Sequence, residues 1–258
     1  MSATIDKEQF ILLRIYGDSL SMPREFDSIP FYRTYPEILR HSLEHIFLGK
    51  RVCLYNRSSG GGMIKSLWTD YQRDSTYFRP DKGDILIIQC GIVDCAPRPI
   101  PSFLGKVVLR LPEIMQNAVR RFLHRYRPYI LHSGFSWRQI VPEEFESNLI
   151  KWFTVASKDF QRVYVLNIAP TNESIEAHSP GLTSSIELYN KLIVNSIELV
   201  GEANIHLIDV YKAICDSNEK LTKFINNQDG HHITQDGHEL YARMIASHEE
   251  SLFKIGKI

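Results

Sequence analysis

Five short runs of apolar residues are spaced along the chain, and each is rich in Val, Ile or Leu. They are Phe10–Tyr16, Arg51–Tyr55, Asp84–Cys90, Arg162–Ile168 and Asn204–Val210. Their apolar character is nearly continuous and does not alternate with polar residues. This pattern is typical of strands that are covered on both faces of a parallel sheet. The runs therefore predict a sheet of five parallel strands.

Segments with apolar residues at helical spacing lie between and after these runs. They are Tyr35–Leu48, Pro112–Tyr126, Pro142–Ser157, Ser184–Val200 and Gly237–Phe253. Strands that alternate with helices form right-handed βαβ units, which pack helices on both faces of one sheet. The sequence therefore predicts an α/β fold, a three-layer α/β/α sandwich of the flavodoxin-like kind.

The length of 258 residues, with 43% hydrophobic and 23% charged residues, suits one α/β domain with a sizeable core. We expect a single domain over residues 1–258, with an irregular insertion of loop and helix around 96–142. Loops on the carboxyl side of such a sheet commonly carry substrate contacts. Packing of its many aromatic residues around one helix is an equally good interpretation of this insertion.

Charge and cysteine content bear on partners and compartment. A formal net charge of zero gives no reason to expect nucleic acid or an anionic membrane as a partner. The first residues lack a signal-peptide pattern, and no apolar run approaches the roughly 18 residues of a membrane span. The four cysteines include no Cys-x-x-Cys pair, so we interpret them as buried free thiols. These features predict a cytoplasmic protein and leave its oligomeric state open.

The first motif that carries chemistry is Gly17-Asp18-Ser19-Leu20, directly after the first predicted strand. Glycine permits a sharp turn off the strand. Such a turn presents the Ser19 hydroxyl at the carboxyl edge of the sheet, where open α/β folds place their sites. Taken alone, the tetrapeptide is also an ordinary turn sequence.

The second motif is Asp229-Gly230-His231-His232, just before the last predicted helix. An Asp-x-x-His spacing can place a carboxylate beside an imidazole, which a serine nucleophile needs as its base. In isolation, Asp229 could equally be a turn or capping residue. The neighbouring histidines are weak evidence for zinc without a clear third ligand, so we expect no metal and no cofactor.

With both motifs present, the chain resembles the SGNH hydrolases, also called the GDSL lipases and esterases. The resemblance covers the order of elements over nearly the whole chain, whereas the matching residues are confined to short blocks. It implies that Ser19 is the nucleophile, His232 the base and Asp229 the partner of that base.

The resemblance extends to the loop Asn56-Arg57-Ser58-Ser59-Gly60-Gly61-Gly62, after the second predicted strand. It implies a glycine here whose backbone N–H joins that of Ser19 in an oxyanion hole, and we favour Gly61. A glycine-rich turn brings backbone donors close to a ligand. A phosphate-binding loop is discounted because no Gly-Lys-Ser/Thr follows.

The third block departs from the family pattern. Family members usually carry Gly-x-Asn-Asp, whereas this chain has Gly91-Ile92-Val93-Asp94. Val93 cannot donate a hydrogen bond, and the loss of one oxyanion donor costs on the order of 10²–10³ in rate. Arg98, Asn167 and Asn56 are candidates for a replacement donor. We assign Asp94 and Arg98 to substrate binding.

The resemblance implies a serine-dependent hydrolase that acts on a small acyl ester. The block that leads to Arg98 looks like that of SGNH-type proteins linked to bacterial surface-polysaccharide synthesis, which favours an O-acetyl group on a carbohydrate. The alternatives are an O-acyltransferase and a catalytically weak glycan-binding member. A flavodoxin-like nucleotide-binding module is a further alternative, although Asp18 would repel phosphate at the first turn.

Overall fold

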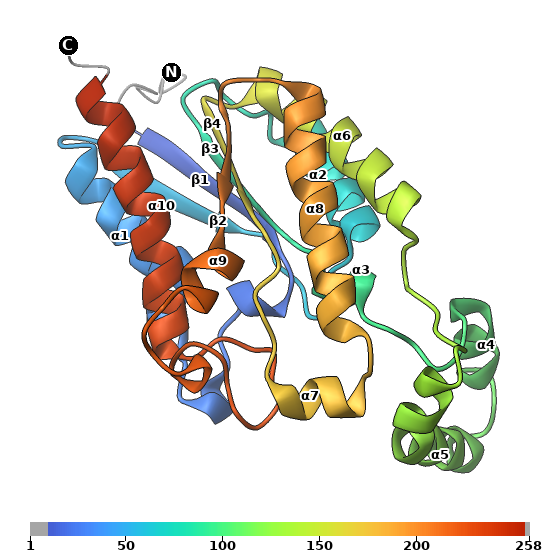
Figure 1. Cartoon of the computed structure of the whole chain (residues 1–258). Helices are drawn as coiled ribbons and strands as arrows, with labels where there is room; N and C mark the ends of the chain where they lie inside the picture. Colours follow the sequence, from blue (N-terminus) through green and yellow to red (C-terminus); the bar gives the residue numbers. More distant parts are fainter. Residues whose placement is uncertain (1–9, 256–258) are drawn as a thin grey trace.

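The computed structural model describes residues 10–255, which are built around a five-stranded parallel sheet (Figure 1). The strands are β1 (Phe10–Gly17), β2 (Arg51–Asn56), β3 (Ile85–Gln89), β4 (Arg162–Leu166) and β5 (Ile205–Ile208). Their order is β2-β1-β3-β4-β5, and every neighbouring pair is parallel. This order reverses direction between β1 and β3, the point at which such sheets open a crevice for ligands.

Helices cover both faces of the sheet (Figure 1). One face carries α1 (Tyr35–Ile46) and α10 (Gln235–Ile255), and the other carries α2 (Ile64–Tyr77), α6 (Pro142–Asp159) and α8 (Leu182–Val200). The three-layer α/β/α prediction is therefore confirmed.

Strand β3 shows why the strands are continuously apolar. Ile85 and Ile87 belong to the core that α1 and α10 cover, whereas Leu86 and Ile88 belong to the core under α2, α6 and α8. Successive side chains of a strand point to opposite faces, so a strand buried on both faces needs apolar residues at every position.

The helical segments predicted from the sequence are present, with shifted ends, and further helices accompany them. Helix α2 went unpredicted because only Ile64, Leu67 and Tyr71 are buried in a largely polar segment. The shorter helices are α3 (Ile92–Cys95), α4 (Ser102–Val108), α7 (Glu173–His178) and α9 (Val210–Cys215). The stretch around 96–142 thus holds α4 as well as α5 (Glu113–His132), and Figure 1 shows both helices standing away from the sheet.

The cysteines match the sequence expectation in part. All four are free thiols, and Cys90 and Cys95 are buried. Cys53 and Cys215 are exposed, which corrects the expectation that all four are buried. Within residues 10–255, no helix combines the length and apolar character that a membrane crossing requires.

Candidate active site

The nucleophile turn follows directly from the end of β1. Ser19 begins a single turn of 3-10 helix, Ser19–Ser21, and the Asp18 carboxylate caps this turn by accepting the backbone N–H of Leu20 at 2.9 Å. Gly17 is required here because a Cβ atom at this position would lie 2.4 Å from Ser21 Oγ. The turn leaves the Ser19 side chain at the carboxyl edge of the sheet, as the sequence predicts.

A buried hydrogen-bond network lies beneath this turn. Gln89 donates its amide to Asp18 Oδ1 at 2.7 Å and accepts the Ser21 hydroxyl at 2.5 Å, and the Ser21 and Tyr35 hydroxyls are 2.8 Å apart. Burial raises the pKa of Asp18 to about 6, although hydrogen bonds from Leu20 and Gln89 oppose this rise. The network fixes the turn from below. Gln89 went unpredicted, and its one signal is a polar residue that ends an apolar strand.

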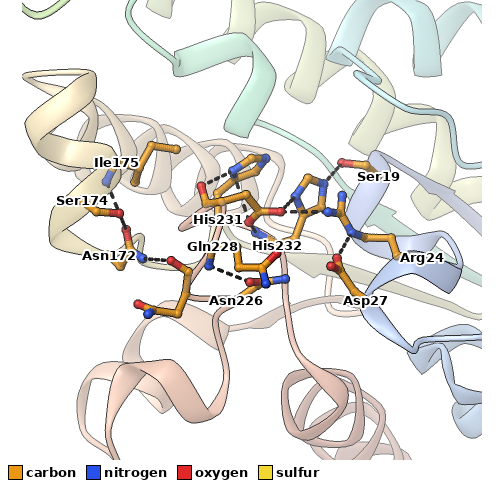
Figure 2. Close-up of polar contacts among 12 residues, drawn as sticks. Ser19, Arg24, Asp27, Asn172, Ser174, Ile175, Asn226, Gln228, His231 and His232 are labelled. Atoms are coloured by element: carbon orange, nitrogen blue, oxygen red, sulfur yellow. Dashed lines mark hydrogen bonds and ion pairs between the residues drawn. The ribbon is translucent and has the colours of Figure 1, made fainter.

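The loop before α10 places His232 beside Ser19, with Asp229 behind His232 (Figure 2). Ser19 Oγ lies 2.9 Å from His232 Nε2, and His232 Nδ1 lies 2.8 Å from Asp229 Oδ2. The other carboxylate oxygen of Asp229 accepts the backbone N–H groups of His231 at 3.2 Å and His232 at 3.0 Å. A serine, a histidine and an aspartate from opposite ends of the chain thus form one continuous line of hydrogen bonds.

The electrostatics of this line suit proton transfer. Burial, the neighbouring His231 and Arg24 together lower the pKa of His232 to about 4, although Asp229 opposes the shift. His232 is therefore neutral near pH 7 and can accept a proton. Burial would raise the pKa of Asp229, but the backbone N–H groups of His232 and His231 and the adjacent imidazoles outweigh it and hold the pKa below its usual range.

Arg24 is a member of this cluster that the sequence motifs did not indicate. Its Nη2 donates to Asp229 Oδ2 at 2.8 Å, and its Nε donates to Asp27 Oδ2 at 2.6 Å (Figure 2). Arg24 therefore shares with His232 the carboxylate oxygen that orients the imidazole. No local spacing pattern connects an arginine after the nucleophile turn with a loop some 200 residues later.

The same cluster is the place where a cation would find donor atoms. Asp229, His231 and His232 offer ligand atoms that lie within 4.8 Å of one another. However, Asp229 Oδ2 is shared by His232 and the positively charged Arg24, whose charge repels a cation. The arrangement therefore fits a proton relay better than a metal centre.

The glycine-rich loop lies beside the nucleophile turn. Ser59 donates its backbone N–H to the Gly17 carbonyl at 3.0 Å, and Gly62 donates to the Ser59 carbonyl at 3.0 Å, which closes a turn. Gly61 has a φ of +71° in this turn, a conformation that favours glycine. Within the described part of the chain, the backbone N–H groups of Gly61 and Ser19 donate to no other group, so both are available to a ligand.

Asp94 of the third block contacts the chain just after this loop, at the start of α2. Its side chain is completely buried, and Oδ1 accepts the backbone N–H of Ile64, the first residue of α2, at 3.1 Å. Burial raises the pKa of the Asp94 carboxyl to about 7. The structure thus makes Asp94 a support of the glycine loop and places its carboxylate away from the surface where a substrate would bind.

The candidates for a replacement donor differ in what already binds them. The Asn56 amide donates to the Ser21 carbonyl at 2.9 Å, and the Asn167 amide donates to Asp209 Oδ1 at 2.7 Å. Val93 is half-buried and packs against the core under α2, α6 and α8. Of the three candidates, only Arg98 has a side chain that makes no hydrogen bond or ion pair with the described residues.

The sheet order, the layers and the position of the serine turn define a class of protein: the chain has the fold of the GDSL, or SGNH, lipolytic proteins. Among solved structures it is similar to a lipase/acylhydrolase from Enterococcus faecalis, with a TM-score of 0.63 and 15% identity over 93% of this chain and 96% of that chain. It is also similar to the acetylxylan esterase Axe2 from Geobacillus stearothermophilus, with a TM-score of 0.58 and 14% identity over 91% and 92% of the two chains.

A third similar structure is a member of the lipolytic G-D-S-L family from Veillonella parvula, with a TM-score of 0.56 and 14% identity over 91% and 95% of the two chains. No family model matches the chain, and no curated protein matches it in sequence. Two further structures of Axe2 are described as catalytic mutants, in which a serine or a histidine is replaced by alanine. At these identities the similarity establishes the fold and confirms the resemblance seen in the motifs.

Proposed function

We propose that this protein is a serine-dependent ester hydrolase in which Ser19, His232 and Asp229 form the catalytic triad. The observation that carries the proposal is the unbroken line of hydrogen bonds from Ser19 Oγ through the His232 ring to Asp229 Oδ2, at 2.9 and 2.8 Å. The neutral state of His232, which follows from its lowered pKa of about 4, supports its role as the base. The catalytic serine and histidine named for Axe2 support the same chemistry on this fold.

The mechanism has two acyl-transfer steps. Ser19 Oγ attacks the ester carbonyl carbon while its proton passes to His232 Nε2, and His232 then gives that proton to the leaving alcohol as the ester C–O bond breaks. Water attacks the carbonyl carbon of the resulting acyl-serine while His232 accepts its proton. His232 returns that proton to Ser19 Oγ as the bond from the acyl carbon to Ser19 breaks and the carboxylic acid leaves. Asp229 stays ionised throughout and stabilises the imidazolium form of His232.

Two backbone donors are available for the oxyanion. The unused N–H groups of Ser19 and Gly61 are our candidates for the groups that hold the carbonyl oxygen as it gains negative charge. Val93 supplies no third donor. We therefore infer that turnover of a simple activated ester is slower than with a complete oxyanion hole, by on the order of 10²-fold.

We further propose that the substrate carries a small acyl ester, an O-acetyl group, on a carbohydrate. Three aromatic side chains of the insertion are exposed: the fractional exposure is 48% for Trp137, 66% for Phe135 and 74% for Tyr129. The backbone of Trp137 pairs with that of Arg98 through two hydrogen bonds of 2.6 and 3.0 Å. Exposed aromatic rings at this place suit stacking on a sugar better than packing in a core, and O-acyl transfer would differ only in that a sugar hydroxyl replaces water.

Replacement of Ser19 by alanine tests the proposal. We expect Ser19→Ala to lower kcat for 4-nitrophenyl acetate by roughly 10⁴-fold or more, because the acyl-enzyme cannot form. The melting temperature should change little, because the Ser19 hydroxyl bonds only to His232 among the described residues. Turnover by Ser19→Ala at the wild-type rate would exclude Ser19 as the nucleophile.

A further inference from the structure

The insertion between β3 and β4 holds most of the charge asymmetry of the molecule. Residues 96–141 contain eight arginines and lysines and a single acidic residue, Glu113, although the whole chain has a formal net charge of zero. Such a concentration of one sign of charge creates a positive potential around α4 and α5. The question is whether this charge only coats the surface or also lines a binding site.

A cavity of about 740 Å³ lies where the insertion meets α7, a size ordinary for small-ligand sites. No aspartate or glutamate is among the residues that line it. Its titratable lining residues are Arg98, Lys106, Arg120, His124, Arg127 and His178. The positive charge therefore faces a hollow as well as bulk solvent.

Arg98 and Arg127 are the most enclosed of these cations, and within residues 10–255 neither is paired with a carboxylate. Arg127 donates to Ser179 Oγ at 2.6 Å and to the Pro97 carbonyl at 2.5 Å. Arg98 Nε is buried and has no partner among the described residues. Burial lowers the pKa of both guanidinium groups, and the charge of Arg98 lowers that of Arg127 further. A partly buried cation without a counter-charge loses hydration without gaining an ion pair, and a bound anion would relieve that cost.

Helix α7 links this cavity to the triad loop. Ile175 lines the cavity, and its Cβ atom lies so close to Gly230 that a Cβ added there would be 3.0 Å away. Asn172 donates its backbone N–H to the Gly230 carbonyl at 3.0 Å, and Figure 2 shows Asn172 and Ile175 next to the loop that carries His231 and His232. The cavity and the triad are thus on two sides of one short helix.

From this geometry we infer that the cavity binds an anionic group of the substrate, a carboxylate, phosphate or sulfate, while the ester lies at Ser19. Arg98 donates to the anion, and Lys106, Arg120 and Arg127 add positive charge around it. That the anion belongs to the ester substrate rests on the proposed function, whereas binding of the anion itself does not. The inference narrows the substrate class to acylated acidic saccharides.

A matched pair of esters tests this inference: methyl glucuronide and methyl glucoside, each bearing one O-acetyl group at the same position. We expect kcat/KM to be roughly 10-fold or more higher for the charged ester. Arg98→Gln should remove most of that preference, chiefly by raising KM for the charged ester. Arg125→Gln is the control, because Arg125 lies on α5, as the lining residues Arg120 and Arg127 do, but does not itself line the cavity. It should leave the preference unchanged.

Binding of inorganic phosphate separates failure of this inference from failure of the proposed function. We expect phosphate to shift the imidazole resonances of His124 and His178 in the wild type and in Arg125→Gln, and to shift them much less in Arg98→Gln. If the wild type cleaves neither ester but these shifts occur, the anion site stands and the hydrolase proposal fails. Equal kcat/KM for both esters without phosphate shifts would overturn the anion site.

The exposed apolar side chains on the insertion define the competing outcome. Phe103, Ile114 and Phe122 are exposed there, and together with the arginines they could contact an anionic bilayer. Co-sedimentation with vesicles of phosphatidylserine and phosphatidylcholine distinguishes anion binding in the cavity from binding to a membrane surface. Binding that falls equally in Arg98→Gln and Arg125→Gln, without an ester preference, would assign the charge to a membrane surface and overturn the cavity.

Discussion

The two sides of the candidate site are built very differently. On the triad side, Ser19, His232 and Asp229 are held by hydrogen bonds, and a buried network fixes the turn beneath the nucleophile. On the side of the third block, Val93 takes the place of a donor, and the side chain of Arg98 has no hydrogen-bond partner among the described residues. The difference teaches that the proposed triad follows the family pattern, whereas the segment that would supply an oxyanion donor and substrate contacts departs from it.

The third block also differs from the triad in its surroundings. Ser19 directly follows β1 and the loop of Asp229 and His232 directly precedes α10, whereas the third block leads into α4 and α5, which stand away from the sheet (Figure 1). An element with few contacts to the core can change its sequence at little cost to the fold. This explains how the basic cavity could arise without disturbing the line from Ser19 to Asp229.

The largest effect is expected from removal of the His232 imidazole. Replacement of His232 by alanine should lower kcat for 4-nitrophenyl acetate by on the order of 10⁴-fold, because among residues 10–255 the Ser19 hydroxyl has a hydrogen bond to His232 alone. His231→Ala is the control, since His231 lies in the same loop and its ring lies beside that of His232, but it makes no hydrogen bond to Ser19 among the described residues. We expect the control to retain most activity. A loss of equal size in both variants would mean that the loop, and not the His232 base, supports activity.

The next largest effect is expected at Val93, in the third block. Val93→Asn should raise kcat by about 10-fold, a part of the roughly 10²-fold that a fully aligned oxyanion donor supplies. Val93→Ala controls for the change in packing and should bring no gain. Steady-state kinetics with 4-nitrophenyl acetate measure both, and equal rates for both variants would show that position 93 does not face the oxyanion.

A smaller effect concerns Arg24 on the triad side. The lowered pKa of His232, about 4, keeps the base neutral, so the acidic limb of kcat/KM should lie below the usual imidazole pKa of about 6.5. Arg24 lowers that pKa, so Arg24→Gln should move the limb to higher pH and cost up to about twofold in kcat/KM at pH 5. An acidic limb that stays in place would mean that Arg24 only anchors the loop. Rescue of the wild-type limb by Arg24→Lys would show that the positive charge is what matters.

The smallest effect on turnover is expected at Asp94, where the readout is stability. The pKa of Asp94 is raised to about 7 by burial, so ionisation costs the folded state more than the unfolded state. Its contribution to stability is therefore complete below a pH of about 4 and is lost as the pH rises to about 7. Relative to wild type, Asp94→Asn should be more stable at pH 8 than at pH 5, by about 1–3 kcal/mol, in urea titrations. If the stability difference between pH 8 and pH 5 were absent, the ionised Asp94 carboxylate would have to be better solvated than its burial implies.

Much of this site could be predicted from the sequence because its key groups lie on short loops at strand ends. Ser19 and the Asp229-x-x-His232 spacing are local signals, and the continuously apolar strands fix which edge of the sheet the loops share. Arg24 and Gln89 could not be predicted, because each acts through a contact with a distant segment that no periodicity encodes. No pattern in the sequence indicated that Asp94 is buried under the glycine-rich loop. That burial depends on α2, a helix whose few apolar residues left it unpredicted.

Covalent labelling of Ser19 tests most directly whether the imidazole of His232 activates it. A fluorophosphonate reacts only with an activated serine hydroxyl, and mass spectrometry of the digested protein locates the adduct. The account predicts one adduct on Ser19 in the wild type, slow or absent labelling in His232→Ala and normal labelling in His231→Ala. A wild-type protein that remains unlabelled at Ser19, or a His232→Ala variant labelled as fast as the wild type, would contradict it.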